Sequence, residues 1–161
     1  LEKLNWFNKK YIQKITEEEL LEKLGNTPGV SQAVSLHTPG VSKDKLTKII
    51  KLVRDRMTTL ADFDKYASIF FEKGTQKPPE KQKCQNAKAA IESISDWNEQ
   101  SISQSLDQWI TKNNLQPADF KNTLRLAVFA DNTPPIYQSL SVLTKEEVLA
   151  RIDDTLTNLS S

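Results

Sequence analysis

The spacing of the apolar residues constrains the fold of this chain more than any other feature, and residues 124–156 show it most clearly. The last apolar residues of this stretch recur at intervals of three and four: Val148, Leu149, Ile152 and Leu156. That spacing places side chains on one face of an α-helix. Alternation with a period of two, which is typical of a β-strand, extends over no more than a few residues anywhere in the chain. The sequence therefore predicts an all-α fold.

Local signals mark where several of these helices begin. Thr144 with Glu147, and Thr16 with Glu19, have the spacing of a capping box, in which each side chain bonds to the backbone N–H of the other residue. The proline pair at residues 134–135 requires the preceding helix to end, and the next helix can begin with a proline at its first position. We therefore expect short helices joined by sharp polar corners.

The size and composition of the chain fit a folded domain. It has 161 residues, of which 37% are hydrophobic, enough for one medium domain or two small packed ones. The formal net charge is +1, so the total charge predicts no polyanionic partner and any electrostatic attraction must be local.

No apolar run approaches the roughly 20 residues of a membrane span, and no signal-peptide pattern is present. We expect a cytoplasmic protein, and the start at Leu1 inside a helical pattern suggests part of a longer one.

The domain organisation is predicted from breaks in the helical pattern. Residues 74–83, GTQKPPEKQK, are polar and contain a proline pair, which breaks a helix and is typical of a linker. We expect two helical subdomains in tandem, residues 1–73 and residues 84–161. Within the first, residues 26–42 contain glycines and prolines with little periodicity, which predicts a long irregular connection.

The residue types needed for catalysis are missing. The sequence contains no Gly-rich phosphate loop, no cluster of His and Cys, and no nucleophile elbow. His37 and Cys84 are each the only residue of their type, without partners at ligand spacing. We predict no catalytic residue and no metal site, and we interpret Cys84 as a solvent-facing thiol. The chain should therefore not catalyse a reaction alone.

The predicted helix over residues 44–57 carries the densest basic charge. Its apolar residues mark one buried face: Leu46, Ile49, Ile50, Val53 and Met57. Basic residues occupy most other positions: Lys43, Lys45, Lys48, Lys51, Arg54 and Arg56. At about 100° per residue, Arg54 and Arg56 fall beside the two edges of the apolar face, where their stems can cover the core while their heads stay in water. A solvated face is the default interpretation, and contact with nucleic acid is the alternative.

Four segments, in order, resemble the C-terminal anticodon-binding region of bacterial-type glutamyl-tRNA synthetases. Residues 3–12, KLNWFNKKYI, are similar to the family's KL-x-W-x-N-x-x-YI segment. Residues 53–71, VRDRMTTLADFDKYASIFF, are similar to its run from a hydrophobic residue through R-x-x-TL to a Phe pair. Asp96-Trp97 before a helix is a weaker match, and residues 124–156 resemble its LR-x-A helix, polar loop, Pro-Pro turn and leucine- and arginine-rich last helix. Because order and spacing agree, the resemblance covers essentially the whole chain.

The resemblance implies a fold and a set of site residues. The fold would be the two helical bundles of the α-helix cage type that class I aminoacyl-tRNA synthetases use to bind the anticodon. The residues expected to face the anticodon are Lys48, Lys51, Arg54, Arg56, Arg125, Phe129, Asn132 and Thr133. Which arginine reads a base stays open, and Phe129 can either stack on a base or complete the core. The loop departs from the family, since the run FADNT at residues 129–133 replaces the usual Thr-Gly pair and is about one residue shorter.

The resemblance also implies partners. The parent protein would be a glutamate–tRNA ligase that uses ATP and Mg²⁺ in a catalytic domain, whose HIGH-like and KMSKS-like signatures this sequence lacks. No cofactor is expected in this region itself. Trp6 and Asn8 would contact the catalytic half, the RNA partner would be tRNA(Glu) with tRNA(Gln) left open, and the protein would be a monomer.

The alternative is a helical protein-interaction or docking module without RNA contact. Such a module needs an exposed apolar patch. The apolar stripes of the predicted helices, including Leu4, Phe7 and Tyr11 near the start, are expected to be used as core.

Overall fold

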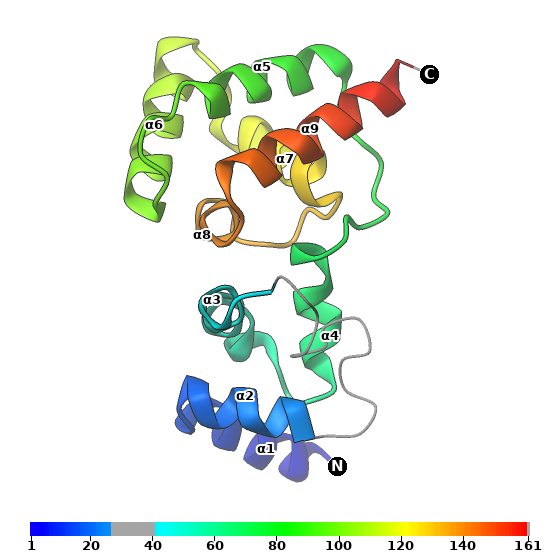
Figure 1. The fold of residues 1–161 in the computed structure, drawn as a ribbon. Helices are drawn as coiled ribbons and strands as arrows, with labels where there is room; N and C mark the ends of the chain where they lie inside the picture. The colour runs from blue at the N-terminus through cyan, green and yellow to red at the C-terminus, as the bar shows by residue number, and fades with distance from the viewer. Residues whose placement is uncertain (27–40, 161) are drawn as a thin grey trace. The chain divides into compact units, whose positions relative to one another are not determined.

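The computed structural model describes residues 1–26 and 41–160. The predicted irregular connection falls mainly on residues 27–40 and, with His37, lies outside the described residues. Every regular element in the described ranges is helical (Figure 1), so the prediction of an all-α fold is confirmed. The chain forms two compact units, Leu1–Phe71 and Glu72–Ser161, which are called the first unit and the second unit below.

Four α-helices and two short 3₁₀ helices build the described part of the first unit. They are α1 (Glu2–Lys14), α2 (Glu17–Asn26), α3 (Lys43–Val53), η1 (Arg54–Arg56), α4 (Asp62–Ala67) and η2 (Ser68–Phe70). α2 packs against α3, and α3 packs against α4. The capping box of Thr16 and Glu19 is present at the start of α2, with N···O distances of 3.0 and 3.2 Å. The predicted basic helix thus ends as α-helix at Val53 and continues as the 3₁₀ turn η1.

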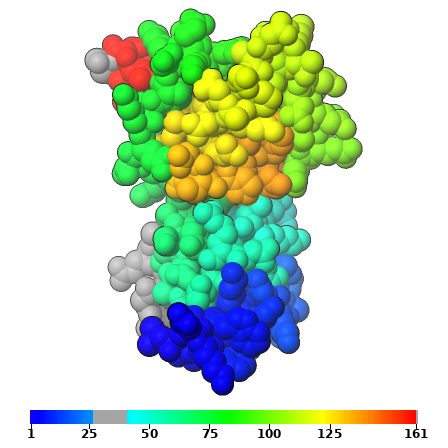
Figure 2. All heavy atoms as spheres, turned by 180° about the vertical axis from the view of Figure 1, so that it is seen from behind, coloured from blue at the N-terminus to red at the C-terminus, as the bar shows by residue number. Residues whose placement is uncertain are grey.

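The first helix departs from the predicted core. Of the apolar residues at helical spacing, only Ile12 is buried, whereas Leu4, Phe7 and Tyr11 keep between 51% and 61% of their surface exposed. Figure 2 shows α1, in dark blue, open at the surface of the first unit. Helical spacing predicted the amphipathic pattern correctly, but nothing in the described part of the first unit covers this apolar face.

Five helices build the second unit: α5 (Lys81–Glu92), α6 (Glu99–Lys112), α7 (Pro117–Phe129), α8 (Ile136–Val142) and α9 (Lys145–Leu159). α5, α7 and α9 pack against one another, and α6 packs against α8 (Figure 1). The predicted capping box of Thr144 and Glu147 starts α9. Pro135 precedes α8 as its cap residue, so the first helical position is one residue later than predicted. These helices enclose a continuous apolar core that includes Ile91, Leu106 and Leu124.

The boundary between the units differs from the predicted linker. Residues 74–83 belong to the second unit, which begins at Glu72. The reason is backbone pairing: the N–H groups of Gly74 and Gln76 donate to the carbonyl oxygens of Phe129 and Ala130 at 2.7 and 2.9 Å. The polar, proline-containing composition predicted a chain without helix at this point but gave no sign of these bonds.

The single cysteine is also placed differently from its prediction. Cys84 is completely buried on α5, and burial raises the pKa of its thiol. The prediction of a solvent-facing thiol was therefore wrong. Cys84 lies three residues before Ala87, and both belong to one buried stripe of α5, the helix that packs on α7 and α9.

Candidate functional site

The corner between α7 and α8, residues 130–135, contains two of the predicted site residues, Asn132 and Thr133. Ala130 ends α7 in the left-handed conformation, at φ 49° and ψ 38°. The Asp131 carboxylate accepts from the backbone N–H of Thr133 at 2.8 Å and from its hydroxyl at 2.6 Å, an Asx-turn that shapes the loop locally. The side chains of Asn132 and Thr133 are exposed at this corner.

The carbonyl groups at the end of α7 are bonded by donors from other parts of the second unit. The last carbonyls of a helix lack partners within the helix, and four of them are satisfied here. The pairs are Thr155 Oγ1 to Ala127 O at 2.8 Å, Arg151 Nη1 to Val128 O at 3.3 Å, Gly74 N to Phe129 O at 2.7 Å and Gln76 N to Ala130 O at 2.9 Å. We call these four donors the tertiary cap of α7. They fix the direction in which the chain leaves the helix.

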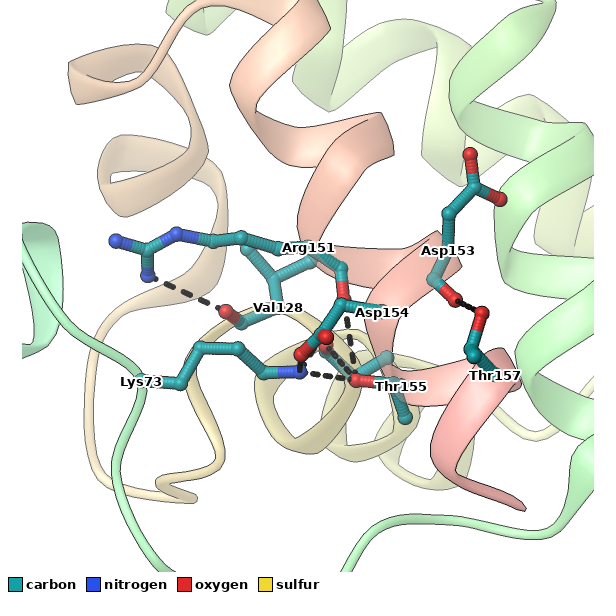
Figure 3. A network of polar contacts seen from close by, with 8 residues as sticks. Lys73, Val128, Arg151, Asp153, Asp154, Thr155 and Thr157 are labelled. Carbon is teal, nitrogen blue, oxygen red and sulfur yellow. Dashed lines mark hydrogen bonds and ion pairs between the residues drawn. The ribbon is translucent and has the colours of Figure 1, made fainter. Parts of the chain in front are cut away.

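Lys73 ties the beginning of the 73–76 segment to α9 (Figure 3). Its ammonium group donates to the carbonyl oxygen of Arg151 and to the Asp154 carboxylate, each at 3.2 Å, and to the hydroxyl of Thr155. Burial lowers the pKa of the Arg151 guanidinium, as expected for a cation that has been taken out of water. The segment is thus anchored at one end by α9 and along its length by the end of α7.

A hollow of about 300 Å³ lies beside the tertiary cap, bordered by Gly74, Gln76, Leu126 and Asn158 among others. The Asp154 carboxylate also borders it. The Lys73 ammonium, which pairs with Asp154 at 3.2 Å, borders the hollow as well, so the two charges at its edge offset each other.

Arg125 lies on α7 beneath the corner. Its Nε donates to the carbonyl oxygen of Pro134 at 2.7 Å, and its side chain is partly buried. Nearby, Tyr137 donates a hydrogen bond to the Asp107 carboxylate. Burial and, after it, this hydrogen bond raise the pKa of Tyr137 far above its usual value. The positive charge of Arg125 lowers the pKa of Tyr137 by a smaller amount. Arg125 therefore joins the two ends of the corner and adds positive charge to it.

Phe129 was predicted either to stack on a base or to complete the core, and the structure shows the second. The ring is completely buried, with the Arg151 guanidinium 5.8 Å from the ring centroid. A ring without exposed surface offers no face to a nucleotide base. The expectation that Phe129 faces the anticodon is therefore corrected.

Arg54 does not keep its head in water as the helical wheel predicted. Its guanidinium donates to the carbonyl oxygens of Ile12, at 2.8 Å, and of Ile15, and it pairs with the Glu17 carboxylate at 3.0 Å. Only 15% of the side-chain surface remains exposed. Arg54 therefore caps the end of α1, which is a structural role within the first unit.

The other predicted cations of the first unit are accessible. Arg56 is exposed and lies with its guanidinium 4.5 Å from the centroid of the Tyr66 ring. Lys48 and Lys51 are exposed, and neither forms an ion pair with any residue in the described ranges. Asp44 and Asp55 are exposed on the same segment, so the positive charge there is less dense than the lysine count alone implied.

The two residues expected to contact a catalytic half both lie on α1. Trp6 keeps 56% of its surface exposed and meets Phe7 edge to face, with ring centroids 5.1 Å apart. Asn8 is partly buried and borders a hollow of about 310 Å³ together with Tyr11 and Leu60. Trp6 is therefore available to a partner surface, whereas Asn8, about 200° around the helix from Trp6, lies on the side that borders Thr59 and Leu60.

The residues that sequence analysis missed are those of the tertiary cap, especially Gly74 and Gln76. Their one sequence signal was Gly74 itself, because a glycine permits a close backbone approach.

Across residues 1–26 and 41–160, none of the helices combines the length and the apolar character that a membrane span needs. Within the same ranges, no group of three or more metal-ligating side chains comes together.

Curated relatives of this chain are glutamate–tRNA ligases. The ligase of Nitrosomonas europaea is 26% identical over 162 residues, which are 94% of this chain and 34% of that protein. Glutamate–tRNA ligase 1 of Pseudothermotoga lettingae is 30% identical over 166 residues, with 96% and 33% covered. The chain thus spans about a third of the length of these relatives.

Solved structures show the same fold. The crystal structure of a glutamate tRNA ligase from Elizabethkingia meningosepticum matches 96% of this chain and 32% of that one, with a TM-score of 0.78 at 23% identity. The glutamate-tRNA synthetase of Elizabethkingia anophelis matches with a TM-score of 0.77. A family model described as anticodon binding domain matches residues 18–156. These include the basic side chains of residues 43–56, the tertiary cap and the corner between α7 and α8. The chain belongs to this family of anticodon binding domains.

Proposed function

We propose that this chain is the anticodon-binding region of a glutamate–tRNA ligase and that it holds the anticodon arm of tRNA(Glu). The observation that carries the proposal is the match of the anticodon-binding family model to residues 18–156, supported by relatives that are glutamate–tRNA ligases. The parent enzyme would act in the cytoplasm as a monomer. It would use ATP and Mg²⁺ to attach glutamate in a catalytic domain outside this sequence.

The corner between α7 and α8 is the proposed base-reading element. The bases of a single-stranded loop are unstacked, so their edges are open to hydrogen bonds from side chains and backbone. Asn132 and Thr133 are exposed there, and both carry groups that donate and accept hydrogen bonds. Arg125, bonded to Pro134 O at 2.7 Å, adds a positive charge close to these groups.

The exposed cations of the first unit are the proposed phosphate contacts. Phosphate contacts fix the orientation of an RNA without reading its sequence. Lys48, Lys51 and Arg56 are exposed, whereas the Arg54 guanidinium is engaged with α1. We therefore assign phosphate contacts to Lys48, Lys51 and Arg56. Arg54 is no longer a candidate for reading a base.

The open apolar face of α1 is the proposed contact with the catalytic domain. Its exposed residues are Leu4, Phe7 and Tyr11, and the exposed Trp6, about 100° further around the helix, meets Phe7 edge to face. Neighbouring apolar side chains at a helix surface are typical of a protein contact. Docking through this face does not compete with RNA binding, because the two use different residues. The alternative of a docking module without RNA contact has less support, since the matching family model is an anticodon binding domain.

A binding titration tests the proposed function. The 161-residue chain is titrated with RNA hairpins that carry the anticodon of tRNA(Glu), the anticodon of tRNA(Gln) or an unrelated anticodon, at two salt concentrations. The expected result is binding that weakens steeply with salt and is tightest for the tRNA(Glu) hairpin. The tRNA(Gln) hairpin shows whether the domain also accepts that tRNA. Failure to bind any hairpin at low salt would overturn the proposal.

A double variant tests whether Lys48 and Lys51 contact phosphates or contribute only to the overall charge of the chain. Replacing Lys48 and Lys51 by alanine should reduce the dependence of log K on log salt by about 0.7 for each phosphate that is no longer neutralised. The matched control replaces Lys81 and Lys112, which are exposed on α5 and α6, and removes the same charge. Equal effects of the two double variants would show that Lys48 and Lys51 do not contact RNA specifically.

A further inference from the structure

We infer that Gln76 is a positioning residue for anticodon recognition, because it holds the corner between α7 and α8 in the shape that meets the RNA. This inference rests on the proposed function and adds to it a residue outside the helices and outside the corner itself. The residues that carry it are Gln76, its neighbour Gly74 and the backbone of residues 129–132.

The corner needs an external support because its backbone conformation is unfavourable. Ala130 has a φ of 49°, a left-handed conformation in which the Cβ of a non-glycine residue lies too close to its own carbonyl oxygen. Such a conformation persists where surrounding contacts hold it. Within the corner, the Asx-turn of Asp131 fixes Thr133 but makes no bond to Ala130.

Gly74 supplies part of that support through its backbone. Its N–H donates to the carbonyl oxygen of Phe129 at 2.7 Å. A Cβ atom at this position would lie 2.6 Å from the carbonyl oxygen of Ala130 and 3.2 Å from its carbonyl carbon. Only a glycine allows the 73–76 segment to come this close to the end of α7.

Gln76 then binds the corner on both sides of Asp131. Its backbone N–H donates to Ala130 O at 2.9 Å, and its side-chain Oε1 accepts from the backbone N–H of Asn132 at 3.1 Å. The amide oxygen of the Gln76 side chain thus accepts a backbone N–H in the way that a backbone carbonyl does between two paired strands. Lys73 fixes the same segment to α9 through bonds to Arg151 O and Asp154.

The side chain of Gln76 is exposed. Its effect on the shape of the corner can therefore be measured without disturbing the core of the second unit. Removing its amide takes no apolar group out of the core, so the second unit should keep its stability. The Asn132 N–H, however, would lose its partner, and residues 131–133 would sample more conformations. Hydrogen bonds to base edges require a fixed geometry, whereas attraction to phosphates does not. Loss of Gln76 should therefore reduce selectivity among anticodons more than it reduces the salt dependence of binding.

The test compares Gln76→Ala, Gln76→Glu and the control Gln82→Ala in the 161-residue chain. Gln76→Glu keeps an acceptor oxygen at the same reach, and Gln82 is an exposed glutamine on α5. The measurements are amide hydrogen exchange at Asn132 without RNA, the melting temperature, the salt dependence, and the ratio of Kd values for hairpins with the tRNA(Glu) and the unrelated anticodon.

The expected result for Gln76→Ala is faster exchange at Asn132 and a selectivity ratio reduced by about two- to tenfold, which corresponds to the loss of one hydrogen bond. Its salt dependence should match the unaltered chain, and its melting temperature should fall by no more than the few degrees that one exposed hydrogen bond contributes. Gln76→Glu should keep the protection of Asn132, and Gln82→Ala should change nothing.

Three outcomes would overturn the inference. Unchanged exchange and selectivity in Gln76→Ala would reject it while leaving the proposed function in place. A lowered melting temperature with loss of binding to all hairpins alike would show a structural role only. Absence of binding by the unaltered chain would reject the proposed function and this inference together.

Discussion

Replacing Arg54 by methionine should destabilise the first unit, because the guanidinium is bonded inside the protein. It donates to two carbonyl oxygens at the end of α1 and pairs with Glu17. A hydrogen bond to a charged group contributes about 1.5–3 kcal/mol. The partly exposed ion pair contributes about 1 kcal/mol or less. Ile15 is partly exposed, so its freed carbonyl can regain water, whereas Ile12 is buried. The expected loss is therefore about 2–4 kcal/mol in the free energy of unfolding.

Urea unfolding of the 161-residue chain measures this loss, and amide hydrogen exchange assigns it to the first unit. The matched control is Arg56→Met, since Arg56 is exposed and lies over the Tyr66 ring; it should cost about 1 kcal/mol or less. Equal stability of Arg54→Met and the unaltered chain, combined with a selective loss of RNA binding, would refute the reasoning and return Arg54 to the RNA-contacting residues.

Three further predictions concern buried or bonded groups. Phe129→Ala should lower the free energy of unfolding of the second unit by about 3–5 kcal/mol in urea, because the ring is completely buried; a loss below about 1 kcal/mol would contradict its place in the core. Cys84 should react with a thiol reagent only after denaturant is added, because the thiol is buried and its pKa is raised; rapid labelling of the folded chain would contradict this. Asp62 accepts from the N–H groups of Thr58 and Thr59 at 2.8 and 2.9 Å; burial alone would raise its pKa, but these bonds lower it on balance. The stability that Asp62 contributes is therefore present above its unfolded pKa of about 3.9 and is lost as pH falls through the folded pKa. Asp62→Asn should cost about 1 kcal/mol at neutral pH, with a difference that shrinks in acid, and a pH-independent difference would rule out the carboxylate as the cause.

The features that could be predicted from the sequence are those set by nearby residues. Both capping boxes depend on two residues three positions apart, so their presence in the structure follows from the local pattern. The helical spacing of apolar residues likewise predicted the all-α fold. The Cys84 error was avoidable, because Cys84 continues the stripe of Ala87, Ala90 and Ile91 by three residues toward the start of α5.

The features that could not be predicted depend on residues far apart in the chain. Arg54 bonds to carbonyls 42 and 39 residues away, and Gln76 bonds to Asn132 across 56 residues. Helical spacing places a side chain on a face but does not tell what that face meets. For the same reason, the apolar residues of α1 looked like core, although the described part of the first unit leaves them open.

The corner between α7 and α8 is proposed to meet the RNA, and an exchange footprint tests this contact directly. Amide hydrogen exchange of the 161-residue chain is measured with and without the tRNA(Glu) anticodon hairpin. Exchange at residues 130–133 should slow when the hairpin is bound, with exchange in α1 unchanged. Slower exchange confined to α1, or no change at residues 130–133 while the hairpin is bound, would contradict it.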